Sequence, residues 1–236
     1  MTNKTIFKCI SLKIFALYGD LLPRKLHRDI LKYHTDKDYK PSTHMLPPRT
    51  GQVPDIDSLI INKQQAEWIS SKIVESTKQL QGNQRGSLKT NGVYKFTLLY
   101  RCSRDGNTFA RFRELCNNKG PTIAVGKVLN TEEILGGYNP FAWGSQNDYA
   151  ATKESFIFAL DKDENIVSFV GNDSSYAIRD CNSYFPTFGN GYDLLFGVGC
   201  SSPYASKSTY QVPIRDSSIS NNFEWVDWEM FLISKL

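Results

Sequence analysis

The sequence predicts an α+β fold: a two-sheet antiparallel β-sandwich with flanking helices, preceded by a short helical N-terminal segment. Three observations support this prediction. Short runs of β-type residues separated by turns fill the chain from residue 122 onward. Residues 156–160 are apolar at both parities, so both faces of that strand should be covered, as at the centre of a sheet in a sandwich. The alternation of strands and helices typical of nucleotide-binding folds does not occur.

The composition is that of an ordinary globular protein. The chain has 236 residues, of which 40% are apolar, 13% aromatic and 22% charged. These values exclude disordered, collagen-like and coiled-coil chains. Since a domain averages roughly 150 residues, we expect one main domain with an appendage. The predicted division is a helical segment over residues 1–40, a Pro-rich linker over residues 41–56 and a main domain over residues 57–236.

The N-terminal appendage carries two amphipathic patterns. Apolar residues from Phe7 to Leu21 recur at spacings of three and four, which predicts a helix that ends before Pro23. A second helix is predicted from Arg24 to Tyr33. Two helices of this size cannot bury their apolar stripes alone, so they must pack on the main domain, on a partner or on further helices.

In the main domain, we expect a helix capped by Asn62 and running to about Thr77, with Ala66, Ile69 and Ile73 on one face. The next predicted element is a strand over 93–101, with Phe96, Leu98 and Tyr100 on one side. A short helix follows, capped by Asn107 or Thr108, and its apolar stripe consists of Phe109, Phe112, Leu115 and Cys116. Further strands are predicted over 122–129, 134–138, 155–160, 166–170, 193–198 and 223–233. Residues 161–165 predict a polar hairpin turn, because a calcium loop would need Gly at Ile166.

The distribution of charge argues against nucleic-acid binding. Residues 1–56 hold ten Lys and Arg against five Asp and Glu, which leaves 18 against 19 in residues 57–236. A domain that binds a polyanion should concentrate basic residues on one face, whereas here both signs are mixed. No transmembrane or signal segment is predicted, and we expect a cytoplasmic protein.

Few residues of the main domain suggest chemistry. All three His lie in the first 56 residues, so catalytic triads and His-ligated metals are not expected beyond them. The five Cys form no C-x-x-C pair and are expected to be reduced thiols, so we predict no metal and no cofactor. Cys102 lies between Arg101 and Arg104, a setting that would lower a thiol pKa if both cations faced it. Glu154 could serve in acid–base chemistry, although a buried anchor or a residue at the start of a strand is the plainer interpretation.

Four segments read together resemble the TLDc domain in order and spacing. They are Leu98–Gly106, Glu133–Pro140, Thr152–Phe158 and Phe223–Ile233, with Phe188-Gly189 and Asp193-Leu194 between the last two. The resemblance covers residues 57–236 and marks family-motif positions of structural or interaction type. These are Arg101, Arg104, Asp105, Gly106, Gly136, Gly137, Tyr138, Glu154, Ser155, Phe156, Asp193 and Cys200. Cys102 stands where a small residue is common, and the segment from Cys200 to Pro213 matches only loosely.

The linker is also informative. Residues 44–49, followed by Ile60–Lys63, resemble the junction in proteins where a BTB-BACK module precedes TLDc. Residues 1–40 then resemble the last helices of BACK. The BTB fold and most of BACK have no counterpart in the sequence, so BTB-type dimerisation and cullin-ligase adaptor roles do not carry over.

The resemblance implies a sandwich of two antiparallel sheets with flanking helices, in agreement with the patterns above. For function it implies protection against oxidative stress and, in several members, binding to the vacuolar proton-pumping ATPase. No catalytic residues are established for this eukaryotic family. We therefore expect a non-enzymatic domain that binds a protein partner and that reaches the vacuolar or lysosomal surface through it. Two alternatives stay open: a peroxide-consuming or hydrolytic enzyme using Cys102 or Glu154, and an adaptor remnant in which residues 1–56 drive oligomerisation.

Overall fold

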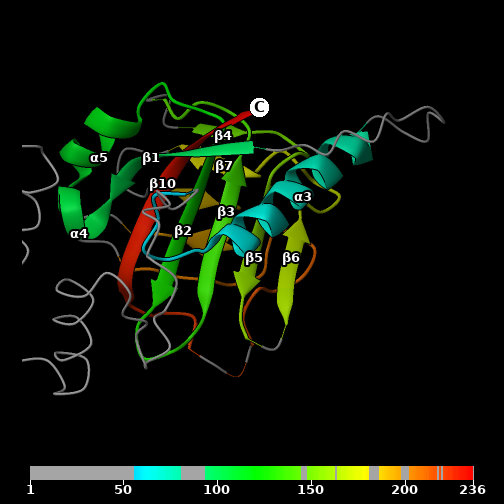
Figure 1. The fold of residues 1–236 in the computed structure, drawn as a ribbon. Coiled ribbons are helices and arrows are strands. Elements are labelled where there is room, and N and C mark those ends of the chain that lie inside the picture. The colour runs from blue at the N-terminus through cyan, green and yellow to red at the C-terminus, as the bar shows by residue number, and fades with distance from the viewer. Residues whose placement is uncertain are drawn as a thin grey trace, which may run out of the picture. The chain divides into compact units, whose positions relative to one another are not determined.

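A computed structural model describes residues 56–80, 94–144, 148–162, 164–180, 186–197, 202–216, 218 and 220–235 (Figure 1). All of them belong to the compact unit Val53–Leu236. The helices predicted for residues 1–40 lie outside the described residues, as do linker residues 41–55 and Cys200. The division of the chain into three parts therefore stays a prediction.

Two antiparallel sheets form the domain, which confirms the predicted fold class. The larger sheet has the order β1-β10-β2-β3-β5-β6 and the smaller has the order β4-β7-β8-β9. The strands of the larger sheet are β1 (Tyr94–Arg101), β10 (Trp225–Lys235), β2 (Thr122–Val128), β3 (Ile134–Asn139), β5 (Phe156–Leu160) and β6 (Asn165–Phe169). Those of the smaller sheet are β4 (Asp148–Ala150), β7 (Ile178–Asp180), β8 (Thr187–Phe188) and β9 (Leu194–Leu195).

Helix α3 (Lys63–Leu80) crosses the face of the large sheet that points away from the small one (Figure 1). Its start is fixed by reciprocal hydrogen bonds: Asn62 Oδ1 accepts from the Gln65 N–H at 3.0 Å, and Gln65 Oε1 accepts from the Asn62 N–H at 2.9 Å. Ile69 and Ile73 are buried, as predicted. The predicted cap and apolar face are thus confirmed, and the helix ends three residues later than expected.

Strand β5 is covered on both faces, as its sequence predicts. Ile157 and Ala159 belong to the core between the two sheets. Phe156, Phe158 and Leu160 belong to a second core beneath α3, where the rings of Trp68 and Phe158 lie 6.1 Å apart. The hairpin from β5 to β6 pairs Leu160 with Asn165, which confirms the predicted turn between them.

The face predicted for strand β1 is wrong at one residue. Phe96 and Leu98 contact the core beneath α3, but Tyr100 is part of the core between the sheets. The reason is a β-bulge: Leu98 pairs with Phe231 and Tyr100 with the adjacent Met230, so Leu99 is an extra residue that reverses the alternation.

Of the short elements, some were predicted from the sequence and others were not. Helix α5 (Phe109–Cys116) is confirmed, and its cap is Thr108, whose side chain accepts a hydrogen bond from the Arg111 N–H. Helix α4 (Cys102–Asp105) and strands β4, β7 and β8 were not predicted. In the run predicted over 193–198, the strand in the described part, residues 193–197, is the two-residue β9. Strands of two or three residues are too short to show an alternating pattern. None of the described helices has the apolar length needed to cross a membrane.

Candidate functional site

The motif arginine Arg101 forms a buried ion pair at the end of β1. Its Nε lies 2.6 Å from Oε1 of Glu229, whose side chain is completely buried, and its Nη2 lies 3.0 Å from Asp57. Glu229 also accepts hydrogen bonds from the Ser58 hydroxyl and the Leu59 N–H. This cluster fastens the segment before α3 to the large sheet.

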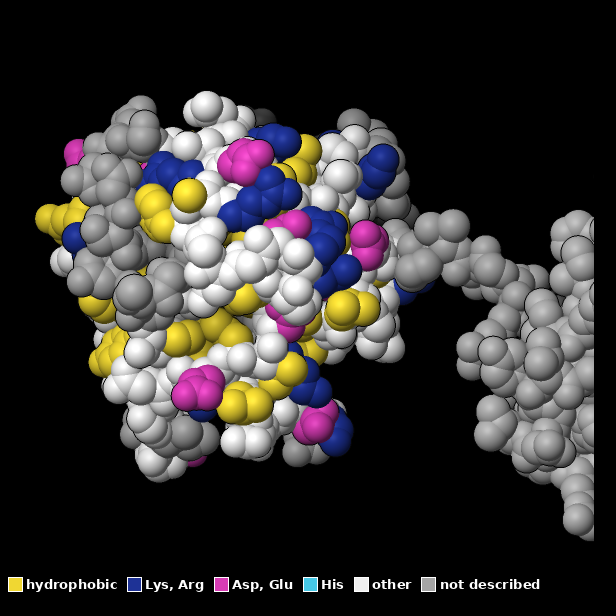
Figure 2. All heavy atoms as spheres, turned by 90° about the vertical axis from the view of Figure 1, so that its left-hand side faces the viewer, with side chains coloured by type: hydrophobic (Ala, Val, Ile, Leu, Met, Phe, Trp, Pro, Cys, Tyr) yellow, Lys and Arg dark blue, Asp and Glu magenta, His cyan; other side chains and the backbone are white. Residues whose placement is uncertain are grey.

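The neighbouring motif residues fix the turn around α4. Asp105 accepts from the Arg101 N–H at 2.9 Å and from Arg104 Nη2 at 2.7 Å, and the Arg104 guanidinium holds the pKa of Asp105 below its usual value. Gly106 ends α4 at a φ of 84°, which favours glycine, and its carbonyl accepts from the Tyr100 hydroxyl at 2.8 Å. On this face, basic and acidic side chains lie beside one another (Figure 2).

Cys102 does not lie in the cationic setting that its sequence neighbours suggest. The guanidinium groups of Arg101 and Arg104 point to Glu229 and Asp105, as described above. Cys102 is half-buried, and burial raises its pKa above the ordinary thiol value. A raised pKa means less thiolate at neutral pH, which disfavours a nucleophilic role.

The motif residues of β3 are packing positions. A Cβ on Gly136 would lie 2.2 Å from the Phe158 ring, and one on Gly137 would lie 2.5 Å from the Phe188 ring. Tyr138 is buried and stacks on Phe156, with ring centroids 5.3 Å apart. The two glycines therefore admit one aromatic ring on each face of the large sheet.

The buried anchor expected at Glu154 is its neighbour Ser155. The Ser155 hydroxyl donates to the Tyr138 carbonyl at 2.7 Å and lies 2.7 Å from the Tyr210 hydroxyl, which donates to the Ala177 carbonyl. Glu154 is only half-buried and directly precedes this anchor, at the start of β5. Ser155 and Tyr210 thus join the two sheets through buried hydrogen bonds.

Asp193 is fully buried and organises the loop that follows β9. Its carboxylate accepts from the backbone N–H groups of Ser208, Thr209 and Tyr210 at 2.8, 2.9 and 3.0 Å. A side chain on Gly189, which has a φ of 79°, would overlap the same carboxylate. The loop over residues 208–210 is therefore held by one buried charge.

The structure brings the motif residues together in two groups. The first group is α4 with its caps, and it contains Arg101, Arg104, Asp105 and Gly106. In the second group, Ser155 and Asp193 both hydrogen-bond to Tyr210. Tyr138 joins this group through the Ser155 hydroxyl, and Phe156 stacks on Tyr138. Sequence reasoning missed Glu229 and Tyr210. Glu229 had a signal, because a lone carboxylate between the buried residues Trp228 and Met230 needs a partner. Among the described residues, no group of His, Cys, Asp or Glu is arranged to hold a metal ion.

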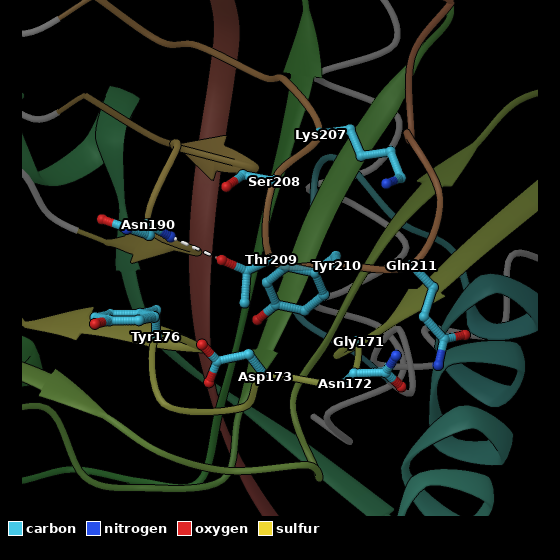
Figure 3. A pocket seen from close by; sticks show the side chains of 10 residues that line it. All are labelled: Gly171, Asn172, Asp173, Tyr176, Asn190, Lys207, Ser208, Thr209, Tyr210 and Gln211. Atoms are coloured by element: carbon cyan, nitrogen blue, oxygen red, sulfur yellow. Dashed lines mark hydrogen bonds between the residues drawn. The ribbon is translucent and has the colours of Figure 1, made fainter.

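A polar pocket of about 600 Å³ lies beside the loop that Asp193 holds (Figure 3). It is lined by Gly171, Asn172, Asp173, Tyr176, Asn190, Lys207, Ser208, Thr209, Tyr210 and Gln211. Sequence reasoning did not find it, because its walls come from loops far apart in the chain. The Lys207–Gln211 wall falls in the segment that matches the family pattern loosely.

Comparison with known proteins gives one result for the domain. The family model described as TLDc domain matches residues 57–234 and therefore covers all the described residues from Asp57 to Ser234. No curated protein matches the chain at a significant level.

Proposed function

Because the chain belongs to the TLDc family, we propose that residues 57–236 form a protein-interaction domain that protects against oxidative stress without a catalytic centre of its own. The finer part of the proposal is that the partner is the vacuolar proton-pumping ATPase, so that a cytoplasmic protein acts at the vacuolar or lysosomal surface. The family membership supports the general role, and binding of the ATPase is implied by the resemblance to TLDc proteins.

The observation that carries the non-catalytic role is that Glu229 and Asp193, the two acidic residues buried in the described part of the chain, already have partners for their carboxylates. Glu229 pairs with Arg101, and Asp193 binds three backbone N–H groups. The partly exposed Asp105 pairs with Arg104 in the same way. A carboxylate that fixes a loop in this manner stabilises a surface shape, and it has little freedom to take part in proton transfer.

The enzymatic alternatives rest on Cys102 and Glu154. Variants of these two residues, expressed in cells, distinguish an enzyme from an interaction domain. Cells lacking the protein are supplied with the wild-type chain, Cys102→Ser or Glu154→Gln and then exposed to peroxide. An interaction domain predicts that both variants protect as well as the wild type. Loss of protection by either variant, at equal protein level, would support an enzyme.

The ATPase is tested with membranes that carry it. The full chain is sedimented with vacuolar membranes, and ATP-driven proton pumping is recorded while the chain is titrated. We expect co-sedimentation that disappears when the membranes are stripped of the cytosolic ATPase sector. Equal sedimentation with stripped membranes would remove the ATPase from the proposal and leave the general role intact.

Residues 1–56 are proposed to pack on another protein or on a second copy, since their apolar stripes need cover. Sedimentation velocity of the full chain over a range of concentrations tests the second-copy version, which predicts a dimer or larger species. A monomer at every concentration would exclude it.

A further inference from the structure

A set of aromatic side chains that contact one another lies beside the polar pocket. We call this set the Tyr–Arg ridge; it consists of Tyr149 from β4, Tyr176 from the loop before β7, Arg179 from β7 and Tyr192 from the loop between β8 and β9. The rings of Tyr149 and Tyr176 are perpendicular, with centroids 5.0 Å apart. The Arg179 guanidinium lies 5.4 Å from the Tyr149 ring and donates to the Tyr192 hydroxyl at 3.1 Å. Tyr176 remains 40% exposed.

The ridge and the pocket form one continuous surface. Tyr176 belongs to both, and the Tyr149 hydroxyl donates to Asn190 Oδ1 of the pocket at 2.8 Å. Tyrosine and arginine, together with tryptophan, are enriched among the residues that contribute most of the binding energy at protein interfaces. Since these rings already hold one another, binding would cost little side-chain entropy.

The wall of the pocket is held in place before any partner binds. Asp193 fixes the backbone of residues 208–210, the Gly171 N–H donates to the Thr209 carbonyl at 2.9 Å, and the Asn190 N–H donates to the Thr209 hydroxyl at 3.0 Å (Figure 3). A wall fixed in this way favours recognition of one shape over accommodation of many.

Lys207 is the group of the pocket that can pair with an acidic side chain. Lys207 is exposed, and it forms no ion pair within the part of the chain that the structure describes. Asp173 lies on the opposite side of the pocket (Figure 3), and hydrogen bonds from Ser175 lower its pKa. Asp173 therefore stays ionised and carries a negative charge on the far side of the pocket, so an acidic side chain is favoured only where it approaches Lys207.

The same geometry favours a carboxylate over a phosphate. A phosphate site needs several converging backbone N–H groups or an arginine fork. Here the N–H groups of residues 208–210 all point to Asp193, and the pocket has a single cation in Lys207. One ammonium with hydroxyl and amide donors suits a single carboxylate.

We infer that the ridge and the pocket together are the partner-binding surface, and that the partner presents a polar loop whose aspartate or glutamate pairs with Lys207 while its neighbours lie on Tyr176. This inference rests on the proposed function, because it supposes that the domain acts by binding a protein.

The test uses the full chain and purified vacuolar proton-pumping ATPase as the probe, with affinity measured by biolayer interferometry. Tyr176→Ala and Lys207→Glu should each lower the affinity about tenfold or more, as truncation at an interface hot spot does. Lys207→Arg, which keeps the charge, should bind within about threefold of the wild type. Lys162→Glu makes the same charge change on the exposed β5–β6 hairpin and should leave affinity unchanged.

The outcomes separate the two claims. If the wild type binds and both Tyr176→Ala and Lys207→Glu bind equally well, the surface is misassigned while the proposed function stands. If Lys162→Glu weakens binding as much as Lys207→Glu, net charge explains the effect and the pairing is wrong. If the wild type itself does not bind, the ATPase is not the partner, and both the proposed partner and this inference fall. As a control for folding, the Tm of each variant is compared with that of the wild type by thermal melting.

Discussion

The carboxylate of Glu229 lies 2.6 Å from Nε of Arg101, although the two residues are 128 positions apart in the chain. They are paired across β10 and β1, so the ion pair ties β1, the edge strand among the described residues, to the strand beside it. A buried ion pair is tolerated when further hydrogen bonds satisfy both groups. Here Asp57, Ser58 and Leu59 supply them, and the segment before α3 becomes part of the sheet's support.

Removing one partner should destabilise the domain strongly. Glu229→Ala leaves the Arg101 guanidinium, which is only 11% exposed, without its main counter-charge. The free energy of unfolding should fall by about 3–5 kcal/mol, measured by urea denaturation. Glu75→Ala breaks the exposed pair with Lys72 and should cost about 0.5 kcal/mol or less. Similar losses for the two variants would contradict the assigned role of Glu229.

The two glycines of β3 should not accept a methyl group. Gly136→Ala and Gly137→Ala place a Cβ against the rings of Phe158 and Phe188, and such overpacking typically costs about 1–3 kcal/mol. Gly144→Ala is the control, because its nearest contact would be an ordinary 3.5 Å. Differential scanning calorimetry should show lower Tm values for the first two only. An unchanged Tm for Gly137→Ala would show that the sheets are farther apart than described.

Asp193 should hold the backbone of residues 208–210 in the pocket wall, although its own side chain is buried. Asp193→Ala removes the acceptor for three backbone N–H groups, so the amides of Ser208, Thr209 and Tyr210 should exchange faster with solvent. Hydrogen exchange followed by NMR measures each amide separately. Asp161→Ala, in the exposed β5–β6 hairpin, should leave these rates unchanged. Equal protection in wild type and Asp193→Ala would refute the anchoring role.

Thiol reactivity provides a pH test. Burial raises the pKa of Cys102, so its rate of alkylation should reach half-maximum at a pH above the free-thiol value of about 8.5. Cys116 is buried, which raises its pKa to about 12, and it should react more slowly still. Peptide mass spectrometry after timed iodoacetamide treatment distinguishes the two thiols. A Cys102 midpoint below about 7.5 would revive the enzymatic alternative.

The raised pKa of Cys116 also predicts how the free energy of unfolding changes at alkaline pH. Between pH 9 and about 12 the unfolded chain loses this proton while the folded chain keeps it. The folded state therefore binds more protons, and the free energy of unfolding should fall as pH rises through that interval. Cys116→Ala should show a shallower fall in urea denaturation. An equal slope in both proteins would mean that the thiol is accessible to water.

The fold was predictable wherever apolar periodicity is long. The apolar run over residues 156–160 predicted a strand covered on both faces, and Asn62 predicted the start of α3. Tyr100 was misplaced because a single bulged residue, Leu99, reverses the faces and leaves no mark on the pattern. The small sheet was not predicted from the sequence, because β8 and β9 have two residues each and their position depends on loops anchored by Asp193.

The site was less predictable than the fold. The resemblance identified the motif residues, but it could not say that Arg101 turns to Glu229 and away from Cys102, since that choice depends on a strand 128 residues later. The pocket depends on Tyr176, Asn190 and Lys207, which come from three separate loops. Such a juxtaposition exists only after folding, and local sequence patterns carry no signal for it.

The central claim is that the domain acts by binding a protein. The most direct measurement is quantitative affinity capture of the full chain from cells under peroxide stress, with the Lys207→Glu and Lys162→Glu variants captured in parallel. We predict that ATPase subunits are enriched with the wild type and with Lys162→Glu and are depleted with Lys207→Glu. Recovery of no protein partner, together with peroxide consumption by the purified chain, would contradict the claim.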